Sequence, residues 1–286
     1  MIVVTGSTGH VGRLVAEELA TRGEPLRLVV RDATRAPQIP AAEVVVADYG
    51  DRAALARVLE RGDRVFMVSL HEGPARRIPL HRSFIEAASR QRVARIVYLS
   101  FLNAGRDARF LHARSHGATE EMLAESGVRF TAVRNGMYAD EIPGWFDPDG
   151  VLREPGGDAP ITFTYRPELA QAIAAVLAHP EHDAPAYDIT TPPVTLDELA
   201  RITADLTGQP YRYEPVDHDV WDARWRADGR SGWQLAAGHT SYEALRAGEL
   251  AVESDDFRLL TGLEPLSVAE IVRRCADGLP LGLRSG

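Results

Sequence analysis

Residues 2–12 read Ile2-Val3-Val4-Thr5-Gly6-Ser7-Thr8-Gly9-His10-Val11-Gly12, an apolar run followed by three glycines at three-residue spacing. The apolar run predicts a buried strand, and apolar residues at helical spacing follow over residues 11–22. Gly6 permits a tight turn, Gly9 lets a phosphate approach the backbone, and Gly12 lets the helix pack closely on the strand. Because the free N–H groups at a helix start attract phosphate, this stretch predicts a dinucleotide site. The residues that we expect to contact the dinucleotide are Gly6, Ser7, Thr8, Gly9, His10, Val11 and Gly12.

The same alternation of strand and helix continues through the first 135 residues. The predicted strands span residues 2–4, 26–31, 43–47, 64–69, 94–100 and 129–134. The predicted helices span residues 11–22, 52–60, 78–90 and 118–126. Near-continuous apolar runs suit strands that are buried on both faces of a parallel sheet. We therefore expect an α/β fold with a doubly wound parallel sheet of the Rossmann type.

The alternation stops after Gly136, where a smaller, mostly helical lobe is expected. Residues 1–136 form the predicted dinucleotide-binding domain, and residues 161–190, with a helix over 168–178 and a strand over 186–190, are expected to return to it. The proline- and glycine-rich residues 137–160 and the segment 191–286 make up the smaller lobe. Thr195 and Glu198 predict a capping box at a helix start. The tryptophans of this lobe suit either a core or a substrate platform; they are Trp221, Trp225 and Trp233.

Charge and composition exclude several classes of protein. The chain has 286 residues, with 32 basic against 41 acidic side chains and a formal net charge of −9. A nucleic-acid surface requires a basic face instead. No apolar run approaches the ~18–20 residues of a membrane span, and the strand at the start leaves no room for a signal peptide. With Cys275 as the one cysteine and no metal-ligand spacing, we expect a cytoplasmic protein with no nucleic-acid, membrane or metal partner.

All 32 basic residues are arginine, so the chain contains no lysine. This absence excludes a lysine Schiff base, a phosphate-binding P-loop lysine and a Tyr-x-x-x-Lys catalytic pair. Any catalytic chemistry must therefore use other side chains.

The end of the second predicted strand bears on the choice of cofactor. It reads Val29-Val30-Arg31-Asp32. A guanidinium at this position pairs with the 2′-phosphate of NADP, whereas a carboxylate hydrogen-bonds the ribose of NAD. Arg31, with Arg35 as a second contact, favours NADP(H) as the cofactor, and Asp32 leaves NAD open.

The glycine spacing resembles that of the short-chain dehydrogenase/reductase superfamily, in its atypical and extended branches. Further motifs resemble the NmrA-like branch and, within it, the type-2 NAD(P)H:quinone reductases. They lie at residues 46–51, 53–55, 81–82, 116–120, 122–127 and 131–138. The likeness covers residues 1 to about 190 and continues faintly around 255–262. It implies that Asp48, followed by Tyr49, lies against the adenine of the cofactor.

The resemblance also points to catalytic residues. Ser100 takes the place of the superfamily serine, and His112 and His116 take the places of its tyrosine and lysine. Carbonyl reduction through a tyrosinate is therefore excluded, and quinone reductases of this branch also have histidine at the position of His116. His116 either contacts the nicotinamide ribose or donates a proton, or it is an ordinary histidine of a helix face. Glu120 either orients His116 or pairs with an arginine, His112 is expected on a loop surface, and Ser100 is alternatively a structural hydroxyl.

The segment after the sixth strand lies at the sheet edge where open α/β sheets bind ligands. Asn135, the backbone of Gly136 and the ring of Tyr138 are expected to meet the nicotinamide and a flat acceptor, although Tyr138 also suits a core position. Ser69, at the end of the fourth strand, is expected to contact the cofactor as well. The candidate catalytic residues are His116, Tyr138 and Ser100.

Three functions fit these motifs. The first is hydride transfer from NADP(H) to a quinone-like or other planar small-molecule acceptor, which needs little acid catalysis. The second is a non-catalytic NADP(H) redox sensor that acts through a regulatory protein partner. The third is a metabolite-tailoring reductase or epimerase. A homodimer is compatible with each of them.

Overall fold

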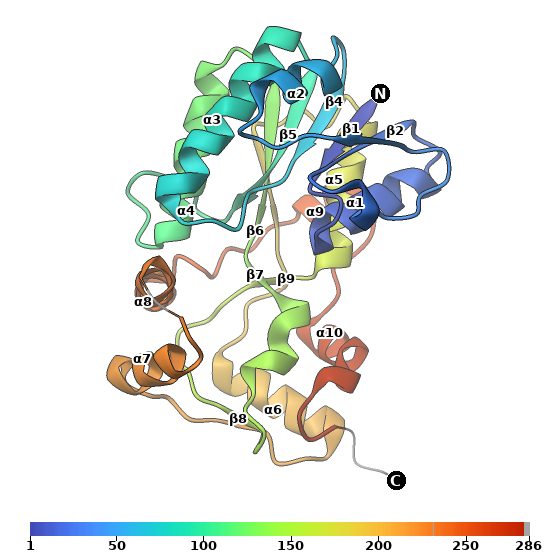
Figure 1. The fold of residues 1–286 in the computed structure, drawn as a ribbon. Helices are drawn as coiled ribbons and strands as arrows, with labels where there is room; N and C mark the ends of the chain where they lie inside the picture. Colours follow the sequence, from blue (N-terminus) through green and yellow to red (C-terminus); the bar gives the residue numbers. More distant parts are fainter. Residues whose placement is uncertain (231, 283–286) are drawn as a thin grey trace.

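The computed structural model describes residues 1–230 and 232–282, and its larger half is built on a seven-stranded sheet (Figure 1). The strands are β1 (Ile2–Thr5), β2 (Leu26–Val30), β3 (Glu43–Val46), β4 (Arg64–Met67), β5 (Arg95–Phe101), β6 (Phe130–Asn135) and β10 (Ala186–Ile189). Their order in the sheet is β10-β6-β5-β4-β1-β2-β3, and every neighbouring pair is parallel. The predicted doubly wound parallel sheet is thus confirmed.

Helices cover both faces of this sheet (Figure 1). One face carries α1 (His10–Thr21) and α5 (Arg166–Ala178), which pack against each other. The other face carries α2 (Arg52–Val58), α3 (Pro74–Gln91) and α4 (Leu111–Glu125), and η1 (Ala33–Arg35) follows β2. Each face has its own apolar core, because the central strands are buried on both sides. The carboxyl ends of the strands point toward the smaller lobe.

The smaller lobe surrounds a third apolar core. It contains β7 (Met137–Tyr138), η2 (Ala139–Trp145), β8 (Val151–Leu152), β9 (Phe163–Thr164), α6 (Leu196–Thr207), β11 (Arg212–Tyr213), α7 (His218–Ala227), α8 (Trp233–Arg246), α10 (Val268–Arg274) and η3 (Ala276–Gly278). The predicted capping box of Thr195 and Glu198 is present at the start of α6. One late helix, α9 (Asp256–Thr261), packs against α5 and β10 rather than on this lobe.

The structure corrects two predicted helix starts. α4 begins at Leu111, not at residue 118, and α3 begins at Pro74, not at residue 78. Gly117 disfavours a helix by propensity, but a side chain there would lie 2.6 Å from the Cα of Gly105, so close packing requires glycine. Among the described residues no helix is long and apolar enough to cross a membrane.

Candidate functional site

The glycine-rich turn joins β1 to α1 and is shaped by close backbone contacts. Gly6 has a positive φ of +63°, and its carbonyl oxygen accepts a hydrogen bond of 2.9 Å from the N–H of Gly9. A Cβ on Gly12 would lie 2.6 Å from the carbonyl carbon of Gly6. α1 has no side-chain cap at its start, so its first N–H groups are free to bind an anion. This arrangement fits the pyrophosphate of a dinucleotide.

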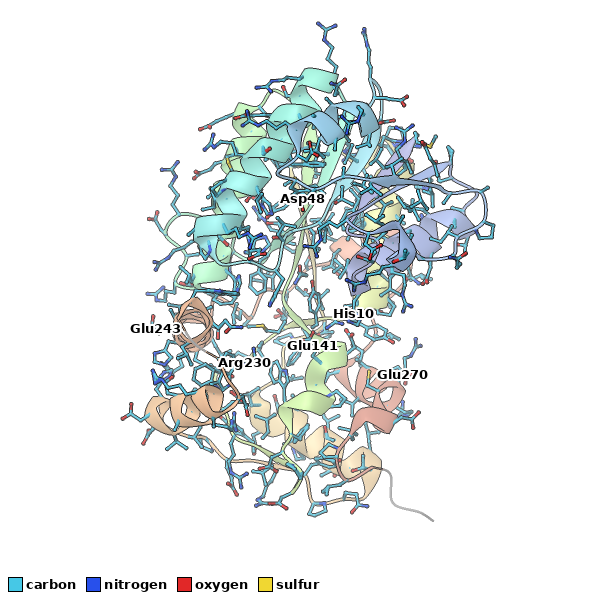
Figure 2. All side chains as sticks on the ribbon, viewed as in Figure 1. His10, Asp48, Glu141, Arg230, Glu243 and Glu270 are labelled. Carbon is cyan, nitrogen blue, oxygen red and sulfur yellow. The ribbon has the colours of Figure 1, made fainter. Side chains whose placement is uncertain are left out.

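A cavity of about 400 Å³, here called the cofactor cavity, opens beside this turn. It extends from the glycine-rich turn along the ends of the sheet strands to β7 and the smaller lobe. His10 and Glu141 line it from the two halves of the molecule (Figure 2). The predicted site residues that line it are Gly6, Gly9, His10, Val11, Gly12, Ser69, His116, Asn135, Gly136 and Tyr138. The structure therefore brings together predicted residues from four separate segments of the sequence.

Other predicted site residues lie outside the cofactor cavity. The Ser7 hydroxyl is buried with no hydrogen-bond partner among the described residues, and Thr8 is exposed. The hydroxyl of Tyr49 is buried, lies 2.7 Å from the Thr5 hydroxyl and donates to the carbonyl of Val68, so its ring belongs to the core.

Ser100 is also turned away from the cofactor cavity. Its hydroxyl is buried and donates a 2.6 Å hydrogen bond to Glu120, whose carboxylate also pairs with Arg134 at 2.6 Å. Of the two interpretations of Glu120, pairing with an arginine is therefore confirmed, and Glu120 does not orient His116. The geometry favours the structural interpretation of Ser100 over the catalytic one.

The end of β2 presents Arg31 to solvent. Arg31 is exposed and makes no hydrogen bond or ion pair with any described residue. The Asp32 carboxylate instead accepts hydrogen bonds from the N–H and hydroxyl of Thr34, at 2.9 and 2.7 Å, and these bonds lower its pKa. Asp48, after β3, is exposed and accepts a 2.8 Å hydrogen bond from the N–H of Gly50. Asp32 is thus engaged locally, whereas the guanidinium of Arg31 is free for an anion.

His116 lies on α4 with its ring almost wholly buried against β5. Its Nδ1 is 3.0 Å from the hydroxyl of Tyr98. Burial, reinforced by the nearby Arg77, lowers the pKa of His116 well below its usual value, so the imidazole is neutral at physiological pH. Burial raises the pKa of Tyr98 to about 12, so this hydroxyl keeps its proton. His116 therefore offers a neutral ring to the cofactor cavity.

Sequence reasoning missed one residue of the cavity wall, Arg77, and misplaced another, His112. The guanidinium of Arg77 donates to the carbonyl of Leu70 at 2.8 Å, to Ser115 at 2.7 Å and to Nδ1 of His112 at 3.1 Å. The expectation that His112 lies on a loop surface is wrong, because its ring packs in the first turn of α4 against Phe110. Burial and Arg77 lower the pKa of His112 to about 3. The unused signal for Arg77 was Pro74, because proline is favoured at the first position of a helix and α3 begins there.

Tyr138 lies where β7 leaves the sheet. The guanidinium carbon of Arg166 lies 4.4 Å from the centre of the Tyr138 ring, and Arg166 also pairs with Asp140, at 3.3 Å, and with Glu141. Burial raises the pKa of Tyr138 to about 12. The ring is thus held in place between the two halves of the molecule.

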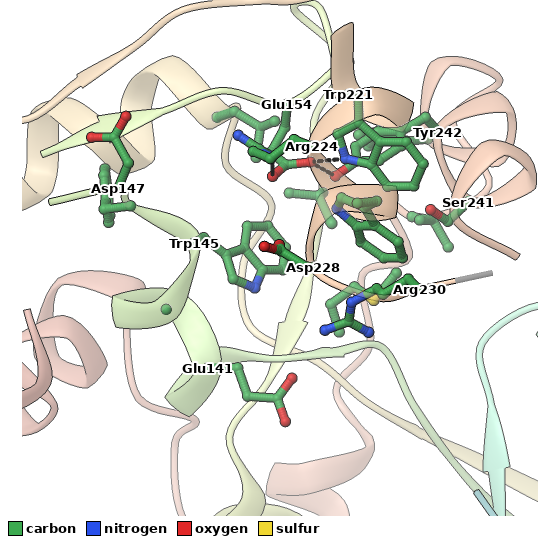
Figure 3. A pocket seen from close by; sticks show the side chains of 18 of the residues that line it. Glu141, Trp145, Asp147, Glu154, Trp221, Arg224, Asp228, Arg230, Ser241 and Tyr242 are labelled. Atoms are coloured by element: carbon green, nitrogen blue, oxygen red, sulfur yellow. Dashed lines mark hydrogen bonds and ion pairs between the residues drawn. The ribbon is translucent and has the colours of Figure 1, made fainter. Parts of the chain in front are cut away.

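A second cavity, of about 690 Å³, lies in the smaller lobe and is called the tryptophan chamber (Figure 3). It shares Met137 and Glu141 with the cofactor cavity, so the two spaces adjoin. Trp145, Trp221 and Trp225 line it. Trp221 is fully buried, and its indole lies 4.1 Å from that of Trp225, measured between ring centres. Trp221 therefore belongs to the core and to the chamber wall at once.

Glu154 anchors one wall of this chamber (Figure 3). Its buried carboxylate accepts hydrogen bonds from the Trp221 indole at 2.6 Å, from Arg224 at 2.6 Å and from the Tyr242 hydroxyl. Burial raises the pKa of Glu154, and these donors oppose that rise. Such a satisfied buried network holds the tryptophan rings in a defined arrangement. Within the described ranges, no three His, Cys, Asp or Glu side chains gather closely enough to hold a metal ion.

Comparison with known proteins identifies the family. The profile of an NAD(P)H-binding family matches residues 6–180. Quinone oxidoreductase 2 of Escherichia coli strain K12 is 33% identical over 238 residues, which cover 80% of this chain and 82% of that protein. The chain therefore belongs to this NAD(P)H-binding family.

Solved structures that resemble the whole fold include two reductases with bound cofactor. The NADPH-dependent quinone oxidoreductase of Escherichia coli, in complex with NADPH, has a TM-score of 0.88 at 29% identity and covers 96% of this chain and 99% of that chain. The triphenylmethane reductase of Citrobacter sp., complexed with NADP(H), has a TM-score of 0.87 at 25% identity and covers 96% and 100%. The resemblance to NmrA-like quinone reductases and the NAD(P)(H) cofactor are confirmed, and the chain is an NAD(P)H-dependent oxidoreductase.

Proposed function

We propose that the protein transfers a hydride from NADPH to a quinone or a similar planar acceptor. The observation that carries this proposal is the junction of the two cavities at Met137 and Glu141. The glycine-rich turn lies at one end of the cofactor cavity, and aromatic side chains line the tryptophan chamber. An acceptor at this junction would meet the part of the cofactor cavity that lies farthest from the turn. When bound, NADPH supplies the hydride.

The chain's own residues account for the binding of the cofactor. The free N–H groups of α1 hold the pyrophosphate, and Gly6, Gly9 and Gly12 keep side chains away from it. Arg31 pairs with the 2′-phosphate, since Asp32 is engaged by Thr34 and Arg31 has no described partner. Asn135, Gly136 and the ring of His116 form the inner wall beside the nicotinamide.

The ionisation of the site favours acceptors that need no acid during hydride transfer. His112 and His116 are neutral because burial lowers the pKa of both, and the Tyr138 hydroxyl, with a pKa of about 12, is a weak acid. A ketone alkoxide requires a proton donor of the superfamily's tyrosine type, which this chain lacks. A quinone gives a delocalised anion that water protonates. The Escherichia coli relative, a quinone oxidoreductase, supports the same acceptor class.

The test is binding and turnover on one preparation. We expect NADPH to bind more tightly than NADH and to be oxidised in the presence of a small panel of benzoquinones and naphthoquinones, with one hydroquinone formed for each NADPH consumed. Tight binding of both nucleotide forms without turnover on any acceptor would contradict the proposal and favour the redox sensor. Light scattering of the same preparation tests whether the protein forms a homodimer.

A further inference from the structure

Arg77 is a buried cation in the wall of the cofactor cavity. Only 3% of it is exposed, and no carboxylate of the described chain lies within ion-pair distance. Its partners are neutral acceptors: the Leu70 carbonyl, the Ser115 hydroxyl and Nδ1 of His112. A buried charge without a counterion is costly in free energy. A positive charge held in this way favours any negative charge that develops nearby.

The contact with Arg77 determines the tautomer of His112. A guanidinium has only N–H donors and no acceptor, so the Nδ1 of His112 that faces it must be without a proton. The neutral ring then carries its proton on Nε2. His116 differs in this respect, because the Tyr98 hydroxyl opposite its Nδ1 can donate or accept. Of His112 and His116, only His112 has a contact that defines which ring nitrogen carries the proton.

The surroundings of His112 leave that donor available. The residue lines the cofactor cavity, and no described residue makes a hydrogen bond with its Nε2. The ring is clamped edge-on by Phe110, at 5.2 Å between ring centres, and by Trp233 of the smaller lobe, at 5.5 Å. A rigid N–H of a neutral ring costs little reorganisation when charge appears beside it.

We propose that Nε2–H of His112 donates a hydrogen bond to the acceptor oxygen that becomes negative during reduction, and that Arg77 is its positioning residue. This role rests on the proposed function. The hydride, with its electron pair, comes from the reduced nicotinamide, which is oxidised, and the quinone becomes a hydroquinone monoanion. The proton that completes the hydroquinone comes from water, and His112 keeps its own.

The first test compares two variants of His112. His112→Phe keeps a ring between Phe110 and Trp233 but removes the donor, and we expect kcat/KM for a benzoquinone to fall about 100-fold. His112→Gln keeps an N–H donor, and we expect it to retain activity within about tenfold of the wild type. The Kd of NADPH should stay within about twofold in both variants. Equal kcat/KM for His112→Phe and the wild type would overturn the inference.

The second test is a binding measurement that needs no turnover. 4-Nitrophenol titrated into the complex with NADP⁺ reports, by its colour, whether the phenol or the phenolate is bound. We expect the wild type to prefer the phenolate by about tenfold or more, and His112→Phe to lose the preference. Arg77→Met should reduce the preference, because the proton of His112 is then free to occupy either nitrogen. Absence of a phenolate preference in the wild type would overturn the inference.

These outcomes separate the inference from the function on which it rests. If the wild type oxidises no NADPH with any quinone, the proposed function fails, whatever the nitrophenol result. If the wild type turns over and the His112→Phe variant does so equally, only the role of His112 fails. Should His112→Phe fail to fold, Arg77→Met and His112→Gln in the nitrophenol titration still decide the matter.

Discussion

The two ends of the cofactor cavity differ in how the sequence builds them. At one end, the glycine-rich turn is made by consecutive residues from Gly6 to Gly12, and both Gly9 and Gly12 pack on the backbone of Gly6. At the other end, the wall contains Arg77, His112 and His116, which two helices bring together from positions up to 39 residues apart in the sequence. The first end holds a cofactor by backbone geometry. The second sets ionisation states by burial, which only the folded chain can supply.

The largest effect is expected from Gly12→Ala at the turn. The added Cβ would lie 2.6 Å from the carbonyl carbon of Gly6, and neither backbone segment can move without disturbing the turn. We expect a loss of about 3 kcal/mol in the free energy of unfolding and at least tenfold weaker NADPH binding. Urea unfolding and a nucleotide titration measure both. Gly144→Ala, where a Cβ meets nothing within 4 Å, is the control, and equal behaviour of the two variants would contradict the role of the turn.

Arg31→Ala should change the cofactor preference at the same end of the cavity. Loss of a charge-assisted pair with the 2′-phosphate should weaken NADPH binding by about 1.5–3 kcal/mol and leave NADH unchanged. Titration with both nucleotides measures the difference. Arg57→Ala is the control: it removes a different exposed arginine, on α2, and should change the affinity for neither nucleotide. Equal weakening of NADPH and NADH by Arg31→Ala would show that Arg31 does not contact the 2′-phosphate.

The buried histidines of α3 and α4 should make the stability of the protein depend on pH. His81 accepts a hydrogen bond from the N–H of Leu70 and lies 3.0 Å from the Thr119 hydroxyl, and burial lowers its pKa to about 3. The unfolded chain binds a proton at this histidine below pH ~6.5, whereas the folded chain does not until pH falls toward 3. Stability is therefore lost as the pH falls through this window, by about 1.4 kcal/mol per pH unit from His81.

Urea unfolding between pH 7.5 and pH 4.5 measures this slope. The His81→Gln variant should show a shallower slope than the wild type by the amount given for one histidine. Parallel pH dependences of the two proteins would mean that His81 takes up its proton as readily in the folded state as in the unfolded chain.

The smallest effect is expected from Tyr98→Phe. The substitution removes the hydroxyl that lies 3.0 Å from Nδ1 of His116, at a cost of about 1 kcal/mol in the free energy of unfolding. If His116 contacts the nicotinamide ribose, the KM for NADPH should also rise a few-fold. Tyr187→Phe, far from the cofactor cavity, should lose similar or less stability and keep its kinetics. Unchanged KM in both variants would assign His116 a purely structural role.

The sheet and the turn could be predicted because their signals are local. Apolar runs and glycine spacing are visible in consecutive residues, and the strands lie within a few residues of their predicted positions. β3 departs from the pattern: Val44 and Val46 are apolar but are 41% and 55% exposed, because β3 is the edge of the sheet. An apolar run in the sequence does not reveal whether the strand will lie in the middle of the sheet or at its edge.

The cavity wall that contains Arg77, His112 and His116 could not be predicted from local signals. The predicted helix over residues 118–126 leaves His112 on a loop, yet α4 starts at Leu111 and Gly117 packs on Gly105. The low pKa of His112 comes from burial and from Arg77, 35 residues earlier in the chain, and the contact with Arg77 also sets its tautomer. Such properties belong to the contact between α3 and α4 and not to either segment alone.

The most direct test of hydride transfer from the cofactor cavity is a single turnover. The protein is loaded with one equivalent of NADPH, mixed rapidly with a benzoquinone, and followed by the absorbance of the reduced nicotinamide. We predict that the absorbance decays in one step, that its rate saturates with quinone, and that hydroquinone appears in equal amount. Bound NADPH that persists unchanged at every quinone concentration would contradict the account.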